Sequence, residues 1–476
     1  MTLDADSCYR ALATRDARFD GRFFVGVSST RIYCRPVCTV RVPRRENCHF
    51  FPSAAAAEIE GYRPCLRCRP ELAPGLAGVD ARARLAQATV DLIENGALDD
   101  GASLESLAAR VGVTSRHLRR VFMAEFGVAP VDYAQTQRLL LAKRLLTDTA
   151  LPVTDVALSS GFRSLRRFNA LFKARYRMAP SRLRKDAAPK ALPDTLDFEL
   201  AYRPPYAFDA MLDFLRDRAI DGVEQVLAQA YRRTLAIEHR GETHAGWIEV
   251  RRTPRRAALA VSLSSSFAQV VPFALARVRH AFDLSCNPLE IEAVLGTLAT
   301  THPGLRVPGA FDGFELAVRA IVGQQITVRA ARTVLGRIAR ELGTPLATGD
   351  RALLFPVASA VAAVPPDRIA AVGMPLSRAR TIVALAHAVA HEDLALGPGS
   401  DVEATIARLV EIPGIGAWTA QYIAMRALRW PDAFPATDLV VLKAMNETRA
   451  PRALARSEAW RPWRAYAVMH LWKGAS

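Results

Sequence analysis

Two close pairs of cysteines near the N-terminus could hold a metal ion. Cys34 and Cys38 form one pair, Cys65 and Cys68 form the other, and 26 residues separate the pairs. Four thiolates at this spacing can surround Zn²⁺ tetrahedrally, since zinc accepts soft sulfur ligands and closed four-coordination. The spacing therefore predicts a zinc site, for which a purely structural role is the alternative. We expect Cys8 and Cys48 to be buried or spare thiols.

A glycine-containing turn near the C-terminus could bind a phosphate. The turn Pro413-Gly414-Ile415-Gly416 follows an apolar segment and precedes a helix that is expected to restart at Trp418. Glycines let successive backbone N–H groups approach a phosphate, and a helix N-terminus adds positive potential. This pattern is typical of a helix-hairpin-helix.

The acid Asp438 follows this turn in a segment bounded by Gly and Pro, which strengthens a functional interpretation. The residues alone leave alternatives open. Trp418 and Tyr422 lie four apart and could be core residues on one helical face, and Asp438 could cap the helix that follows, or do both. Asp432 is a competing acid, which we expect in an exposed turn.

These motifs need elements to position them, and the length of 476 residues suggests about three domains. Segment 1–78 is a small Cys-rich mixed module, 80–187 is helical, 188–196 is a linker, 197–285 contains strands, and 286–476 is mainly helical. The expected fold class is multidomain α+β: a small zinc-binding module, an all-α double helix-turn-helix domain, a mixed α/β subdomain and a mainly α-helical helix-hairpin-helix domain.

The charge of the chain favours a polyanionic partner. Its formal net charge is +16, and residues 1–190 contain 31 basic against 19 acidic residues. Such a basic half suggests nucleic acid, although surplus arginine also occurs simply as a solubilising surface. No run of about 18 apolar residues predicts a membrane span, and MTLDADSCYR is not a secretory signal. We expect a cytoplasmic, nucleoid-associated protein with no membrane partner.

Residues 103–126 and 153–176 repeat one pattern: an Ala in a first helix, a Gly at a turn and a basic second helix. A single match could arise by accident, but two copies 50 residues apart indicate a pair of helix-turn-helix units, which place their second helices in the major groove. The candidate DNA-facing residues are Arg116, His117, Arg119 and Arg120 in the first unit, and Arg163, Arg166, Arg167 and Lys173 in the second.

The cysteine segment also resembles a known family. IYCRPVCTVRVPRRENCHFF followed by GYRPCLRCRPE resembles the N-terminal methyl-acceptor domain of the Ada adaptive-response proteins. The resemblance implies that Zn-bound Cys34 irreversibly accepts a methyl group from a DNA methylphosphotriester, once per molecule. Four thiolates on Zn²⁺ have a formal charge of about −2, and methylation reduces it to about −1, so repulsion from DNA falls. That this change switches on DNA binding is implied by the resemblance.

The helical repeats resemble a second family. YAQTQRLLLAKRLLTDTALPVTDVAL and GFRSLRRFNALFKARYRMAPSRLR resemble the AraC-type DNA-binding domain. The resemblance implies transcriptional activation, with promoter DNA and RNA polymerase as partners.

The C-terminal half, from about Leu200 to Trp472, resembles the helix-hairpin-helix glycosylase superfamily, and within it 3-methyladenine DNA glycosylase II. The matching segments include YRPPYAFDAMLDFLRDRA, GLRVPGAFDGFELAVRAIVGQQ and RPWRAYAVMHLW. The resemblance implies that Asp438 is the catalytic carboxylate, and it assigns three further groups of residues. These are Trp418, Tyr422 and Trp472 in the base pocket, Gln325 as a wedge in the duplex where the family has Leu, and Pro413, Gly414, Ile415, Gly416 and Thr419 on the DNA backbone, with a monovalent cation.

Some features of related enzymes are missing. Lyase-type relatives have a Lys where this chain has Trp418, so we expect a monofunctional glycosylase that leaves an abasic site. After residue 187 only Cys286 remains, which excludes an iron–sulfur cluster on local cysteines. No Pro-Cys-His-Arg motif of a second Ada methyltransferase domain occurs, so repair of O⁶-methylguanine is not expected.

The expected function is an alkylation-damage response: a DNA glycosylase for 3-methyladenine-type bases, fused to a transcriptional regulator that accepts methyl groups at Cys34. We expect a monomer that binds double-stranded DNA. Two alternatives remain: a regulator whose glycosylase-like half binds DNA without turnover, and a zinc or thiol stress sensor in which Cys34 reacts with oxidants.

Overall fold

The structure is a computed structural model in which the described residues are 4–74, 81–94, 96–98, 102–183, 195–254, 256–346, 352–392 and 394–475. The chain divides into two compact units. The first unit comprises residues 1–204, 253–276 and 284–287, and the second comprises residues 205–252, 277–283 and 288–476.

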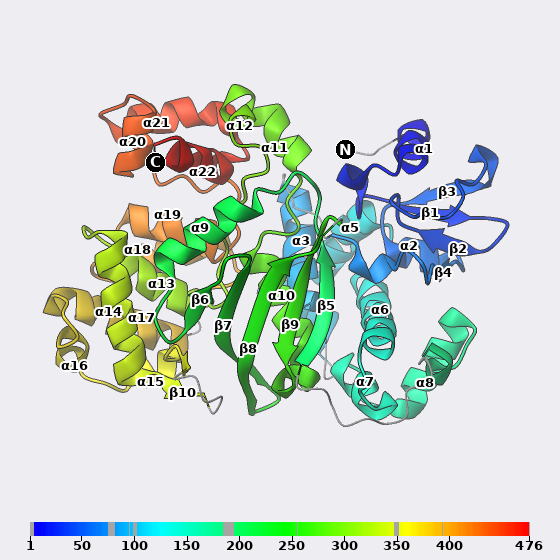
Figure 1. Ribbon diagram of the computed structural model, residues 1–476, viewed down its shortest axis with the longest axis horizontal. Helices are drawn as coiled ribbons and strands as arrows, with labels where there is room; N and C mark the ends of the chain where they lie inside the picture. Colours follow the sequence, from blue (N-terminus) through cyan, green and yellow to red (C-terminus); the bar gives the residue numbers. More distant parts are fainter. Residues whose placement is uncertain are drawn as a thin grey trace. The chain divides into compact units, whose positions relative to one another are not determined.

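The first unit begins with a cysteine-rich module built on a small sheet (Figure 1). Its main elements are α1 (Ala5–Thr14), β1 (Phe24–Val27), β2 (Ile32–Cys34), β3 (Cys48–Phe51), α2 (Ala54–Ile59) and β4 (Arg63–Pro64). The strand order is β3-β1-β2-β4, and β2 and β4 are parallel. Because β2 ends at Cys34 and β4 runs directly into Cys65, this parallel pair brings one cysteine of each predicted pair to the same end of the sheet.

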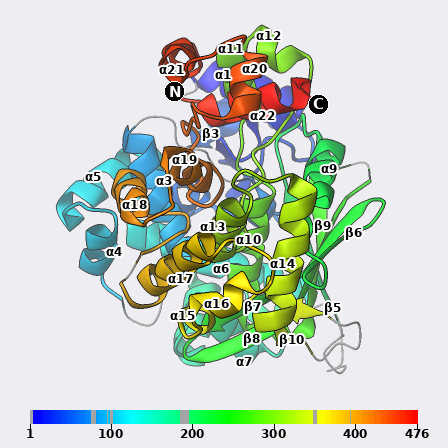
Figure 2. The same cartoon turned by 90° about the vertical axis from the view of Figure 1, so that its left-hand side faces the viewer.

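Helices form the next part of the first unit, as the sequence predicts. They are α3 (Ala81–Glu94), α4 (Leu104–Arg110), α5 (Ser115–Phe126), α6 (Pro130–Asp148), α7 (Val153–Ser159) and α8 (Leu165–Tyr176). The two sequence repeats fold as the helix pairs α4–α5 and α7–α8, and α6 connects them (Figure 1 and Figure 2). Thr114 and Ser164 cap the second helix of each pair by accepting main-chain hydrogen bonds at 3.3 Å.

The predicted linker at 188–196 lies outside the described residues up to residue 194, and residues 195 and 196 begin β5 (Thr195–Ala201). β5 pairs antiparallel with β9 (Ala258–Ser264), also in the first unit. α6 packs on β5: the Arg144 guanidinium lies 4.9 Å from the ring centre of Phe198 and donates to the Glu199 carbonyl at 2.7 Å.

The second unit contains the antiparallel strands β6 (Glu224–Val226), β7 (Ala230–His239) and β8 (Glu242–Arg252), together with α9 (Phe208–Arg218). Arg240 and Gly241 join β7 to β8, with φ values of 53° and 79°. Positive φ at both central residues is typical of a tight hairpin whose twist matches its strands. The strands expected within residues 197–285 are therefore confirmed. α10 (Val271–Ala281) spans a boundary between the two units.

Helices make up most of the rest of the second unit (Figure 2). They are α11 (Pro288–Leu295), α12 (Thr297–Thr300), α13 (Gly313–Val322), α14 (Val328–Leu342), α15 (Ala358–Ala362), α16 (Pro366–Ala370), α17 (Leu376–His391), α18 (Val402–Glu411), α19 (Ala417–Arg426), α20 (Leu439–Ala444), α21 (Ala450–Ser457) and α22 (Arg464–Gly474), with the short strands β10 (Thr344–Pro345) and β11 (Leu353–Leu354). Ile321, Leu385 and Ile423 bring α13, α17 and α19 into one apolar core.

The helix pair α18–α19 is joined by residues 412–416, which include the turn that the helix-hairpin-helix pattern predicts. The expected multidomain α+β fold class is confirmed. Across the described ranges, the structure contains no helix whose length and apolar character would suffice for a membrane span.

Candidate functional sites

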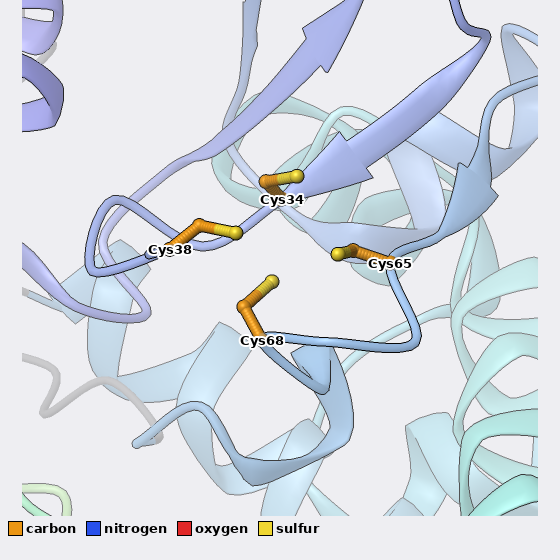
Figure 3. A group of neighbouring side chains, drawn as sticks. All are labelled: Cys34, Cys38, Cys65 and Cys68. Atoms are coloured by element: carbon orange, nitrogen blue, oxygen red, sulfur yellow. The ribbon is translucent and has the colours of Figure 1, made fainter. Parts of the chain in front are cut away.

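The predicted zinc ligands Cys34, Cys38, Cys65 and Cys68 converge in the cysteine-rich module. Their sulfur atoms all lie within 4.8 Å of one another, and their side chains point toward a common centre (Figure 3). Zn–S bonds of about 2.3 Å in a tetrahedron would place neighbouring sulfurs about 3.8 Å apart. The donor set and its size therefore fit Zn²⁺.

The pKa values of these four thiols depend on one another. Hydrogen bonding to Cys38 raises the pKa of the Cys34 thiol, whereas hydrogen bonding to Cys34 lowers the pKa of Cys65. Adjacent negative charges repel one another, so the four thiols do not ionise independently. All four can be thiolates together only when a cation compensates their charge.

Arg35 fixes one side of the cluster. Its main-chain N–H donates to the Cys68 sulfur at 3.3 Å, and its guanidinium donates to the Cys68 carbonyl at 3.2 Å. The same guanidinium is paired with the buried carboxylate of Asp20, with 2.9 Å between Nε and Oδ1. Sequence analysis missed both residues, although the position of Arg35 directly after Cys34 was an available signal.

Cys8 and Cys48 lie outside the cluster, in an apolar core with Phe23 and Val25. Burial raises the pKa of the Cys8 thiol to about 11. They are buried thiols, as expected from the sequence.

The predicted operator-facing arginines are all exposed. Arg116, Arg119 and Arg120 lie on α5, where Arg120 contacts the His117 ring at 3.0 Å. Arg166 and Arg167 lie in the first turn of α8, and Arg163 lies just before it. Their contact with DNA stays a prediction.

In the second unit, Asp438 is the N-cap of α20 and is 9% exposed. Its Oδ1 accepts the main-chain N–H groups of Val440 at 3.0 Å and Val441 at 2.9 Å, and the indole N–H of Trp472 at 3.1 Å. Its Oδ2 accepts the indole N–H of Trp418 at 2.9 Å. The carboxylate thus has one fixed orientation.

Aromatic rings stand beside this carboxylate. Trp418 and Tyr422, one turn apart on α19, are stacked with ring centres 5.2 Å apart and an interplanar angle of 14°. Trp472 of α22 lies 6.2 Å from Tyr422. All three rings are half-buried. The structure therefore brings Asp438 and the three predicted pocket residues together, and it does not bury the rings completely as core residues.

Two arginines that the sequence did not point to lower the pKa of the Tyr422 phenol. Burial alone would raise the pKa of its phenol, but the charges of Arg426 and Arg218 outweigh burial and lower it. Arg426 donates to the Tyr422 hydroxyl at 2.5 Å and is fixed from behind by the Pro308 carbonyl at 2.7 Å. The spacing of Arg426, one turn after Tyr422, was the available signal.

The expectation that Asp432 lies in an exposed turn is wrong. Asp432 is 5% exposed. It accepts two hydrogen bonds from Arg464, at 2.6 and 2.9 Å, and pairs with Arg461. Both arginines lie far along the chain, so local sequence gave no sign of this burial. The ion pairs occupy Asp432, which leaves Asp438 as the better candidate acid.

The hairpin between α18 and α19 is held by side chains from α17 and the end of α13. Thr381 donates to the Pro413 carbonyl at 2.7 Å. Gln324 donates to the Gly414 carbonyl and to the Thr419 hydroxyl, both at 3.0 Å. Gly414 has φ 94°, and a Cβ there would lie 2.2 Å from the Thr381 hydroxyl oxygen, so the turn requires glycine. Thr419 is buried and its hydroxyl accepts from Gln324, so its contact with DNA stays a prediction.

Gln325, the predicted wedge, is exposed between α13 and α14 and has φ 57°. A non-glycine residue in this left-handed region is uncommon and often marks a functional site. The neighbouring Ile326 is 37% exposed and is an apolar alternative at the same tip.

Comparisons with known proteins match each part of the chain to a family. Residues 7–71 match the metal binding domain of Ada, 107–186 a helix-turn-helix domain, 197–312 the AlkA N-terminal domain, and 318–464 the HhH-GPD superfamily base excision DNA repair proteins.

Individual relatives agree with these matches. The "Probable bifunctional transcriptional activator/DNA repair enzyme AlkA" of Mycobacterium tuberculosis is 38% identical over 98% of this chain and 96% of its own length. DNA-3-methyladenine glycosylase 2 of Escherichia coli is 37% identical over 58% of this chain and 96% of its own. The solved 3-methyladenine DNA-glycosylase of Archaeoglobus fulgidus shares the fold, with a TM-score of 0.51 and 19% identity over 58% of this chain and 98% of its own.

Fold and sites together define a class of protein, in which an Ada-type metal-binding domain and a helix-turn-helix domain are fused to a helix-hairpin-helix repair fold. The chain belongs to the family of bifunctional transcriptional activator/DNA repair enzymes AlkA. The matches to known families confirm the fusion of a glycosylase to a regulator that the sequence predicts.

Proposed function

We propose that the second unit excises alkylated bases of the 3-methyladenine type from double-stranded DNA, with Asp438 as the catalytic carboxylate. One observation carries the proposal: a carboxylate that accepts four hydrogen bonds stands beside the rings of Trp418, Tyr422 and Trp472. The target base must be flipped out of the stack to reach such a site, and exposed Gln325 is the proposed wedge.

The reaction is hydrolysis of the bond between C1′ and the base nitrogen. When this bond breaks, its electron pair goes to the base and neutralises the cationic ring, while positive charge develops on the sugar. Water adds to C1′ and releases a proton. A fixed negative charge at Asp438 stabilises the sugar cation; for scale, one preorganised hydrogen-bond donor in an oxyanion hole contributes about 2.7–4 kcal/mol. Each aromatic face adds about 0.5–2 kcal/mol of cation–π attraction for a cationic base.

We further propose that the enzyme is monofunctional. A lyase needs an amine that attacks C1′, and the corresponding position is the Trp418 indole, whose N–H is bonded to Asp438. The product is then an abasic site with an intact strand.

Base release from methylated duplex DNA tests the enzyme, comparing wild type with Asp438→Asn. Asp401→Asn is the matched control, since Asp401 is the exposed N-cap of α18 in the same unit. We expect release of 3-methyladenine by wild type and control only. Strand cleavage in the same samples would contradict the monofunctional proposal, and no release by folded wild type would contradict the enzyme proposal.

For the first unit we propose methyl transfer from DNA methylphosphotriesters to Cys34. The Cys34 sulfur forms a bond to the methyl carbon, the bond from that carbon to the phosphate oxygen breaks, and a phosphodiester anion leaves. Zinc, when bound by the four cysteines, keeps them as thiolates at neutral pH. Cys34 is 6% exposed, whereas Cys68 is half-buried, so the identity of the acceptor needs a direct test.

Peptide mapping by mass spectrometry after treatment with methylated DNA provides that test. We expect a mass increase of one methylene on the peptide with Cys34, and none in Cys34→Ser. Methylation of Cys68 would contradict the assignment, and disulfide formation alone would favour the stress-sensor alternative.

We propose, finally, that the exposed arginines of α5 and α8 bind promoter DNA, that RNA polymerase is the partner in activation, and that the protein is a nucleoid-associated cytoplasmic monomer. Mobility shifts with promoter fragments, before and after methylation, test DNA binding. Light scattering tests whether the protein is a monomer. A monovalent cation at the hairpin would share the carbonyls of Pro413 and Gly414 with the side chains that already donate to them.

A further inference from the structure

A basic cavity lies in the first unit, between the cysteine-rich sheet and the C-terminal end of α8. Its volume is about 390 Å³, and four arginines line it: Arg31, Arg63, Arg175 and Arg177. Ser29 and Thr30 belong to the same lining, which contains no acidic residue.

The sheet fixes the arginines on one side of this cavity. Arg31 donates to the Glu60 carbonyl at 2.6 Å and lies 4.5 Å from the ring centre of Tyr62. Arg63 is in β4, where its main-chain N–H donates to the Arg31 carbonyl at 2.9 Å. Gly61 has φ 79°, and a Cβ there would lie 3.0 Å from the Arg31 guanidinium. The local backbone thus leaves room for Arg31.

The other two arginines come from the end of α8. Arg175 is in its last turn, and Arg177 is its left-handed C-cap residue. Cations at a helix C-terminus compensate the partial negative charge of its carbonyls. This effect accounts for the positions of Arg175 and Arg177. It does not explain Arg31 and Arg63 on the opposite wall. Within the part of the chain that the structure describes, Arg63, Arg175 and Arg177 form no ion pair within 4.0 Å of a carboxylate, and only Arg175 acts at longer range on the buried carboxyl group of Glu58. Four like charges in one cavity repel one another unless an anion compensates them.

We propose that this cavity binds a phosphate group, and that the phosphate belongs to the backbone of bound DNA. Guanidinium groups recognise phosphate by paired N–H donors, and the volume accommodates a nucleotide-sized group. The charge continues along α8: Arg166 and Lys173, spaced i and i+7, share one face of the helix, and Arg177 follows directly after its last residue. The cavity alone supports a phosphate-binding site, whereas the assignment of that phosphate to DNA rests on the proposed regulatory function.

A phosphate in this cavity would contact both domains of the first unit at once. Arg31 and Arg63 belong to the cysteine-rich module, and Arg175 and Arg177 belong to the second helix-turn-helix. The cysteine-rich module would then contribute directly to DNA affinity, in addition to the operator arginines.

The test compares Arg63→Gln/Arg177→Gln with Arg10→Gln/Arg110→Gln in the zinc-loaded full chain. The control removes two exposed arginines outside the cavity, one from each domain. Duplex DNA affinity is measured by fluorescence anisotropy over a salt series, and DNA binding by the second unit is common to all variants. Log affinity falls as log salt rises. We expect this fall to be less steep in the cavity variant, with a slope smaller in magnitude by about 1 than that of the control. Equal circular dichroism and zinc content verify folding.

A second arm measures binding of inorganic phosphate and of a deoxynucleoside monophosphate by calorimetry. A lower salt slope in the cavity variant supports the whole proposal. Variant-sensitive binding of free phosphate or nucleotide with an unchanged salt slope supports the phosphate site and overturns DNA as its source. No difference from the control in either arm overturns the proposal. If wild type binds no promoter DNA, the regulatory function fails, and the calorimetric arm still decides the cavity.

Discussion

Replacing Asp438 by Asn separates the charge of this carboxylate from its role as a helix cap. Asn caps a helix about as well as Asp, so one amide oxygen can keep the bonds to Val440 and Val441. The amide nitrogen then takes the place of Oδ2 and meets the indole N–H of Trp418, donor against donor. An unsatisfied donor costs about 1–3 kcal/mol, and the lost charge at the helix start about 0.3–1 kcal/mol.

A double-mutant cycle with Trp418→Phe isolates this contact. In the native background, the Phe variant should destabilise the second unit by about 1.5–3 kcal/mol, because a hydrogen bond to a charged acceptor is lost. In the Asp438→Asn background it removes the opposing donor and should recover about 1–3 kcal/mol. The change of sign, measured in the urea transition of the second unit, is the signature. Equal destabilisation in both backgrounds would refute the proposed geometry.

The same variants predict activity. Asp438→Asn should slow base release by about 10²–10³-fold, which corresponds to about 2.7–4 kcal/mol of lost stabilisation of the sugar cation. Single-turnover release from methylated duplex measures this step without product dissociation. Release within a few-fold of wild type, by an Asn variant with a native unfolding transition, would remove Asp438 from the catalytic role.

Three further predictions concern other parts of the structure. Arg426→Met should raise the pKa of the Tyr422 phenol, which ultraviolet titration against Tyr422→Phe would detect; an unchanged phenol titration would exclude Arg426 as the cause. Burial raises the pKa of Glu58 to about 7, so its neutral form favours the fold: this stability is fully present below the unfolded value near 4.5 and is lost as pH rises through 7. Glu58→Gln should flatten that dependence in thermal unfolding, and an identical pH profile would contradict it. Cys38→Ser should lose one equivalent of zinc by metal analysis, together with the fold of the cysteine-rich module; full zinc retention would exclude Cys38 as a ligand.

The sequence predicted those features that depend on local spacing. Cys34 ends β2 and Cys65 directly follows the parallel strand β4, and each is followed within four residues by its partner cysteine, so two short spacings define the whole cluster. Both helix-turn-helix units begin and end within one residue of their sequence repeats, since caps such as Thr114 are themselves local signals.

Partners that are distant in the chain were beyond this reasoning. Asp432 looked exposed because Pro and Asp are typical of turns, but Arg464, 32 residues later, buries it in an ion pair. Gln324 reaches Gly414 across 90 residues. Such contacts depend on how helices pack, which local periodicity does not determine, and this explains why the supporting residues were missed.

Asp438 illustrates how a local signal and a site come to coincide. The sequence left open whether this residue caps a helix or performs catalysis; the structure shows that it caps α20, and the cap geometry is compatible with the proposed catalytic role. An N-cap residue has extended backbone, here φ −67° and ψ 123°, so its side chain folds back onto the first turn and ties Oδ1 to two main-chain N–H groups. Oδ2 is then directed away from the helix, where Trp418 of α19 meets it. The orientation of the carboxylate is set by the start of α20, and only the aromatic wall has to be supplied by other helices.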